Sequence, residues 1–159
     1  MTPVMQAIHY IEHVVQDHGD ERTVLGLYGT GGGMDPAAME WFGRLLAWSW
    51  PPSYVETLGK YNGVIVQNAI VHSFIKSIDY FMIMRESWQP AEYWPVSDDE
   101  CGNYHVLSLG LRNDRGECPV LAIYHDVEHP IKYADSYAEF IVRLMGEQCE
   151  SVRCTFRTQ

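Results

Sequence analysis

Apolar residues recur at helical spacing in the N-terminal part of the chain. After Thr2-Pro3, a helix-starting pair, they repeat every three or four positions: Val4, Ile8, Ile11 and Val15. Asp35-Pro36 and then Pro52 open two further periodic segments, and Asn62-Gly63 ends the last with a pair that favours a left-handed cap. The sequence predicts three helices here, and the last two have these core-facing residues: Met39, Phe42, Leu45, Leu46, Tyr54, Val55, Leu58 and Tyr61.

The pattern changes after Gly63. Residues 64–75 are rich in β-branched side chains and predict a strand with a bend at Gln67-Asn68, whereas residues 77–88 fit either a short helix or a second strand. Three further segments predict strands: residues 104–109, residues 119–124 and a short one near Ile131. The sequence RNDRGE predicts a hairpin turn between the first two of these.

A capping box, Ser136 with Glu139, opens a closing helix with Phe140 and Leu144 on its apolar side. Helices, then a block of strands, then one helix is an α+β order. It predicts an antiparallel sheet with helices packed on one face. The 159 residues fit a single domain, residues 1–159, without an internal repeat or linker beyond a glycine-rich loop.

Charge narrows the functions that fit this domain. Lys and Arg total 11 and Asp and Glu total 21, so the formal net charge is −10. Such a surface repels phosphate backbones, so we expect no direct nucleic-acid binding, but it attracts a basic partner. The N-terminus lacks a basic signal-peptide region and no segment is long enough to span a membrane, so we expect a cytoplasmic protein with reduced cysteines.

Two short motifs suggest a phosphate-binding loop and a metal site, but neither has the spacing or the local structure that such a site requires. GTGGG at residues 29–33 is followed by Met34-Asp35-Pro36 instead of the Gly-Lys-Ser/Thr of a phosphate loop, so we interpret it as a linker. His125 and His129 could ligate a metal, with Cys101 and Cys118 as further candidates, but the stretch ends in proline and is not helical. We expect no metal, no cofactor and no catalytic residues, and a metal-dependent hydrolase remains the least favoured alternative.

The segment SDDECGN, residues 97–103, predicts a hairpin corner, because Asp and Asn bind their own backbone and Gly102 tolerates a positive φ. A rigid turn with three carboxylates is also a good electrostatic docking point. The contact candidates are the acidic residues of this turn and of residues 125–130, with two flanking aromatics that could equally be core residues: Asp98, Asp99, Glu100, Asp126, Glu128, Tyr93 and Trp94.

Three stretches in this order resemble the SUKH superfamily, of the Smi/Knr cell-wall-regulator type. They are WPPSYVETLGKYNG, YWPVSDDECGNYHVLSLG and IKYADSYAEFIVRLM, and the similarity covers about residues 36–146. The N-terminal helix and the glycine-rich loop look like additions, and residues 67–88 have no clear counterpart.

The resemblance implies a function without catalysis. Bacterial members of the family look like immunity proteins that bind a cognate polymorphic or contact-dependent toxin, often a nuclease, and block its active site. The acidic charge agrees, since nucleases carry basic clefts. The resemblance also allows a regulatory or scaffold module of the cell-wall-regulator type. An exposed sheet edge would allow either a monomer or a homodimer.

Overall fold

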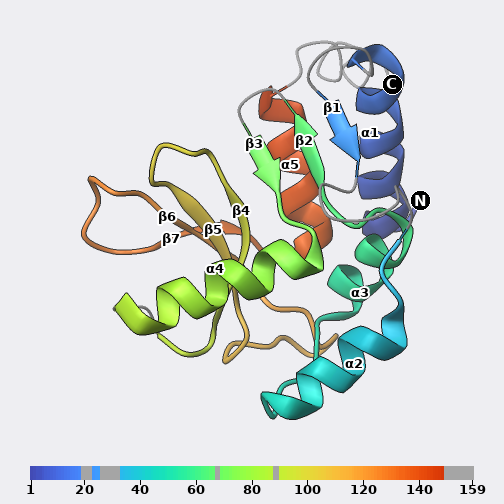
Figure 1. Cartoon of the computed structure of the whole chain (residues 1–159). Coiled ribbons are helices and arrows are strands. Elements are labelled where there is room, and N and C mark those ends of the chain that lie inside the picture. Colours follow the sequence, from blue (N-terminus) through green and yellow to red (C-terminus); the bar gives the residue numbers. More distant parts are fainter. Residues whose placement is uncertain (19–22, 26–32, 67–68, 88–89, 149–159) are drawn as a thin grey trace.

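The computed structural model describes residues 1–18, 23–25, 33–66, 69–87 and 90–148 as an α+β fold with five helices and a seven-stranded sheet (Figure 1). The helices are α1 (Pro3–His18), α2 (Pro36–Leu45), α3 (Pro52–Lys60), α4 (Phe74–Ser87) and α5 (Tyr137–Gln148). The strands are β1 (Thr23–Leu25), β2 (Val64–Val66), β3 (Ala69–Val71), β4 (Tyr93–Asp98), β5 (Tyr104–Ser108), β6 (Val120–Ile123) and β7 (Ile131–Ala134).

The strands form one antiparallel meander in chain order, β1 to β7. The predicted α+β class and antiparallel sheet are confirmed. In β4 the register shifts between Pro95 and Ser97, so that Trp94 pairs with Leu107 but Asp98 pairs with Tyr104. Such a bulge changes which face of the sheet the following side chains occupy.

The predicted helix starts are visible as hydrogen bonds. The Thr2 hydroxyl accepts the Met5 N–H at 3.2 Å, and the Asp35 carboxylate accepts the Ala37 N–H at 2.9 Å. At α5 the Ser136 hydroxyl accepts the Glu139 N–H at 3.2 Å, which is one half of a capping box. These side chains satisfy N–H groups that have no partner inside a helix.

One face of the sheet packs against α1, α3 and α5, which also contact one another. Trp94 and Leu107 lie on this face, and the Trp94 indole donates to the Tyr54 hydroxyl of α3 at 2.9 Å. Five aromatic rings surround Trp94 with centroids at 4.7 to 6.4 Å: Phe42, Trp48, Trp50, Phe74 and Phe81. This cluster is the centre of the core, and edge-to-face and tilted pairs stabilise it.

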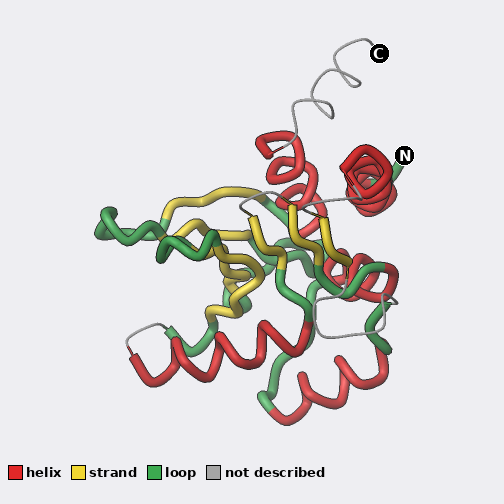
Figure 2. The backbone as a smooth tube through the Cα atoms, turned by 45° about the horizontal axis from the view of Figure 1, so that its top comes forward, coloured by secondary structure: helices red, strands yellow, loops and turns green. Residues whose placement is uncertain are grey.

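The segment that fitted either a helix or a strand is helix α4. The expected packing of helices on one face describes α1, α3 and α5, whereas α4 also covers the opposite face, where Met84 packs with Val106 and Ile123. In Figure 2 the strands run between α4 on one side and α1 with α5 on the other. Two strands, β2 and β3, replace the single bent one, and the expected bend at Gln67-Asn68 lies outside the described residues.

One predicted core residue is exposed in the structure, and some predictions concern residues outside the described ranges. Leu45, expected in the core, is 62% exposed, because α2 presents Met39 and Gly43 to the core and Leu45 falls on the outer side. Residues 29–32 of the glycine-rich loop, the C-terminal tail and the side chain of Val15 lie outside the described part of the chain.

Candidate functional site

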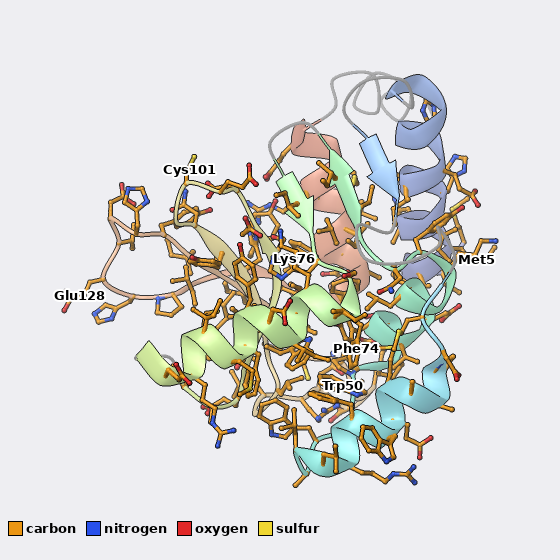
Figure 3. The ribbon with its side chains drawn as sticks, in the orientation of Figure 1. Met5, Trp50, Phe74, Lys76, Cys101 and Glu128 are labelled. Atoms are coloured by element: carbon orange, nitrogen blue, oxygen red, sulfur yellow. The ribbon has the colours of Figure 1, made fainter. Side chains whose placement is uncertain are left out.

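The turn between β4 and β5 and the turn between β6 and β7 lie at the same end of the sheet (Figure 1). Asn103 joins them: its side-chain oxygen accepts the backbone N–H of His125 at 3.2 Å and lies 2.9 Å from Nδ1 of that imidazole. A Cβ on Gly102 would lie 3.7 Å from the His125 Cβ. Residues 22 positions apart in the chain are therefore held together, and Figure 3 shows Cys101 and Glu128 at this end.

The exposed carboxylates at this end come from both turns. Glu100 lies on the first turn, and Asp126 and Glu128 lie on the second. We call these three residues the acidic apex. Water surrounds them in the free protein, and a partner that covers them must supply positive charge, since a buried, unpaired carboxylate is strongly unfavourable.

Asp98 has a different environment, because it is 4% exposed. One carboxylate oxygen lies 2.6 Å from Nε2 of His72 and 3.2 Å from Nζ of Lys76, and the other accepts the Glu100 N–H at 3.0 Å. Burial alone would raise the pKa of Asp98, but the hydrogen bonds and charges of its neighbours outweigh burial and lower it. Burial lowers the pKa of His72, so a neutral imidazole donates to an ionised Asp98 that Lys76 balances.

Asp99 fixes the conformation of the turn. One of its oxygens accepts the N–H groups of Cys101 and Asn103 at 2.8 and 3.1 Å, and the other accepts the Asn103 amide at 2.6 Å. Partial burial raises the pKa of Asp99, but these hydrogen bonds more than compensate and lower it. The turn also holds Glu100 at φ 58° and Gly102 at φ 94°, the left-handed region that favours glycine.

The seven predicted contact residues therefore differ in how far the fold exposes them. Glu100, Asp126 and Glu128 are exposed, and Asp99 and Tyr93 are half-buried. Asp98 and Trp94 are buried, at 4% and 0% exposure, so they present little or no surface to a partner in the folded protein. Asp98 is buried because the β4 bulge turns it toward α4, and Trp94 takes the core role that its sequence context also allowed.

Three residues that position this end of the sheet were not predicted from the sequence: His72, Lys76 and Asn103. A histidine at the end of the apolar run VIVQNAIV was a weak signal of a buried imidazole with a carboxylate partner. Asn103 was recognisable only as a turn residue. Its contact with His125 depends on the exact register of the predicted β5–β6 hairpin, in which Tyr104 lies opposite Ile123.

Metal ligands, cysteine thiols and membrane-spanning helices are the other features that bear on function. Among these residues, the structure contains no group of three or more His, Cys, Asp or Glu side chains that could hold a metal ion. Cys101 is an exposed thiol and Cys118 a buried one, both unoxidised. Within the described part of the chain, the helices are too short or too polar to cross a membrane.

The described residues thus define an α+β protein whose distinctive surface is an acidic end built from two joined turns. The chain belongs to the SMI1 / KNR4 family (SUKH-1), whose model matches residues 33–143. This match confirms the resemblance seen in three sequence stretches and covers well over half of the chain. A comparison with curated proteins gave no match.

Proposed function

We propose that this chain is an immunity protein that binds a cognate toxin domain and occludes its active site. The acidic apex carries the proposal, because Glu100, Asp126 and Glu128 are exposed on two turns at the same end of the sheet, and Asn103 joins these turns through His125. Membership of the SUKH-1 family supports it. The partner with matching chemistry is a basic nuclease domain, whose cleft binds phosphates through positive side chains.

The geometry suits the imitation of a nucleic-acid backbone. The apex carboxylates extend into solvent, while the Asp98 and Asp99 carboxylates are occupied within the fold and hold the turn in shape. A turn that is already ordered loses little conformational entropy on binding. The net charge of −10 attracts a basic domain over a distance and raises the association rate.

In this proposal the protein acts in the cytoplasm by binding alone, without catalysis or a cofactor, as a monomer or a homodimer. The alternative is a regulatory or scaffold module, which rests on family membership without a further structural observation. The two functions differ in their salt dependence. Binding of a toxin to the acidic apex should weaken with ionic strength, because exposed charges are screened over about 10 Å at 0.1 M salt.

The experiment combines co-expression with binding kinetics. Domains encoded by the genes that adjoin this one are expressed with and without the protein, and cell survival identifies the toxin domain. Association of the catalytically inactivated toxin domain is then measured with the variant Glu100→Gln/Asp126→Asn/Glu128→Gln. We expect survival with the wild-type protein, and an association rate constant reduced about 10-fold or more for the variant at low salt.

A charge-matched control separates the apex from net charge. The variant Glu56→Gln/Glu92→Gln/Asp114→Asn removes three exposed carboxylates that lie on α3, before β4 and in the β5–β6 turn. It should bind nearly as fast as the wild type. Failure of the protein to protect cells against the neighbouring toxin, together with absence of binding, would refute the proposed function.

A further inference from the structure

Helix α4 is apolar on its outer side as well as its inner side. Phe74, Ser77, Phe81 and Met84 are buried against the sheet and core, as a packed helix requires. The opposite side carries Ile75, Met82 and Ile83, which are 46%, 51% and 64% exposed. These three residues do not contribute comparably to the core, so the fold alone does not account for their apolar character.

Two acidic residues lie among these apolar ones. Asp79 and Glu86 are exposed and follow Ile75 at four and eleven positions, which places all of them on one side of a helix with 3.6 residues per turn. We call the five residues Ile75, Asp79, Met82, Ile83 and Glu86 the α4 stripe. It is an apolar surface with negative charge along its length.

The positive groups of α4 do not cancel this charge. The Lys76 ammonium lies 3.2 Å from the Asp98 carboxylate and its side chain is 12% exposed, so it is already paired and largely covered. Lys76 lies at the N-terminal end of α4, where the helix approaches the strands (Figure 3). Arg85 is exposed but directly precedes Glu86, so it lies about 100° away around the helix.

The α4 stripe adjoins the acidic apex through Tyr80. The Tyr80 ring lies 5.9 Å from the Tyr104 ring of β5, centroid to centroid, and 4.6 Å from the His72 ring. The first acidic turn is also held against α4, because the Asp98 carboxylate lies 3.2 Å from Nζ of Lys76 and accepts the Glu100 N–H at 3.0 Å. Tyr80 and Tyr104 are half-buried and form a bridge between the stripe and the first acidic turn.

We propose that the α4 stripe is the second part of the toxin-binding surface, and that it packs against an apolar ridge on the same basic domain that the acidic apex contacts. The inference rests on the proposed function. Its partner is fixed by charge complementarity, since apolar side chains interspersed with Asp79 and Glu86 fit an apolar surface bordered by Lys or Arg. The apex determines how fast the complex forms, and the stripe determines how long it lasts.

The test separates these two rates. The variant Ile75→Gln/Met82→Gln keeps helix-forming side chains of similar length but removes apolar contact area. With the inactivated toxin domain of the neighbouring gene, we expect the dissociation rate constant to rise about 10-fold to 100-fold, because truncated interface anchors act mainly on dissociation. The association rate constant should stay within about twofold of the wild-type value.

Leu45→Gln is the matched control, because Leu45 is also an exposed apolar residue on a helix, at 62% exposure on α2. It should leave both rate constants unchanged. Thermal melting of each variant checks that the fold is intact. If the complexes of wild type and of Ile75→Gln/Met82→Gln have equal dissociation rate constants, the inference is overturned. In that outcome the proposed function still stands if the apex variant binds slowly.

Two other outcomes also count against the inference. If wild-type protein forms a concentration-dependent dimer in sedimentation and Ile75→Gln/Met82→Gln abolishes it, the stripe is an interface between two copies of this chain. If wild-type protein does not bind the toxin domain, the proposed function and the inference fail together.

Discussion

The two acidic turns at one end of the sheet use their carboxylates in different ways. In the β4–β5 turn, three consecutive acidic residues have three environments: Asp98 is buried and paired, Asp99 accepts hydrogen bonds within the turn, and Glu100 is exposed. In the β6–β7 turn, Asp126 and Glu128 are both exposed. In the first turn, two of the three carboxylates accept hydrogen bonds that hold the fold. In the second turn, both carboxylates are exposed to solvent.

This difference shows that the number of charges in a segment does not measure its binding surface. Backbone geometry decides how much of each charge remains available to a partner. Asp98 and Asp99 contribute to the shape of the site, and their direct contribution to a partner is small because His72, Lys76 and Asn103 already occupy them. Substitutions at the two turns should therefore act on different properties of the protein.

The largest expected effect is at Asp98. Asp98→Asn removes the charge that balances the mostly covered Lys76 ammonium, and loss of one partner of a buried ion pair costs about 3 kcal/mol or more in the free energy of unfolding. Urea unfolding measures this change. Glu100→Gln, two residues away, should change it by less than about 0.5 kcal/mol. Equal effects of the two substitutions would contradict the division between buried and exposed charge.

Acid should lower the free energy of unfolding, through the first turn and through two buried histidines. In the folded protein the pKa values of Asp98, Asp99 and His72 are lowered, and that of His105 falls to about 4 through burial. The unfolded chain therefore binds more protons, and stability decreases as the pH falls. The histidine contribution is lost from about pH 6.5 downward, and the carboxylate contribution is lost below about pH 4.

Urea midpoints between pH 7 and pH 3 measure this loss. Asp99→Asn should flatten the decline below about pH 4, because an amide at this position does not titrate. Asp126→Asn/Glu128→Gln, in the second turn, should keep the wild-type profile, since both residues are exposed. Stability that rises on acidification would show that the buried pairs are assigned incorrectly.

A smaller effect is expected at Asp99. Asp99→Ala removes three hydrogen bonds in the turn, from the Cys101 and Asn103 N–H groups and the Asn103 amide. Because the turn is near solvent and water can replace some of them, the expected loss is about 1 to 2 kcal/mol. Urea unfolding measures the loss, and amide exchange at residues 100–103 should accelerate more than exchange in β5. Unchanged exchange in the turn would contradict this role.

Much of this architecture could be predicted from local patterns. Proline and capping residues predict where α1, α2, α3 and α5 begin, and the Asn-Gly and Asp-x-Gly signals predict where the chain turns, because these rules depend on a few neighbouring residues. Helix α4 stayed ambiguous because it is apolar on both sides, with Phe81 inside and Met82 outside. A helix of this kind lacks the one-sided pattern by which a helix is recognised.

The candidate site was predictable only in part, for a different reason. The acidic run and the HDVEH segment are visible in the sequence, but their proximity depends on the register of the β5–β6 hairpin, which places Tyr104 opposite Ile123. The burial of Asp98 depends on a single-residue bulge between Pro95 and Ser97, and a shift of one residue moves every following side chain to the other face. Simple alternation along the strand does not indicate this bulge.

The smallest expected effect on stability is at the second turn, and it makes the sharpest test of the comparison. Asp126→Asn/Glu128→Gln should change the free energy of unfolding by less than about 0.5 kcal/mol, because neither exposed side chain holds the fold together. The same variant should slow association with the toxin domain and reduce its salt dependence, as measured by stopped-flow mixing at several ionic strengths. Asp99→Ala should show the reverse, with lower stability and a less altered salt dependence. If both variants lowered stability alike, the two turns would be equivalent structural corners, and the acidic apex would lose its distinction as a binding surface.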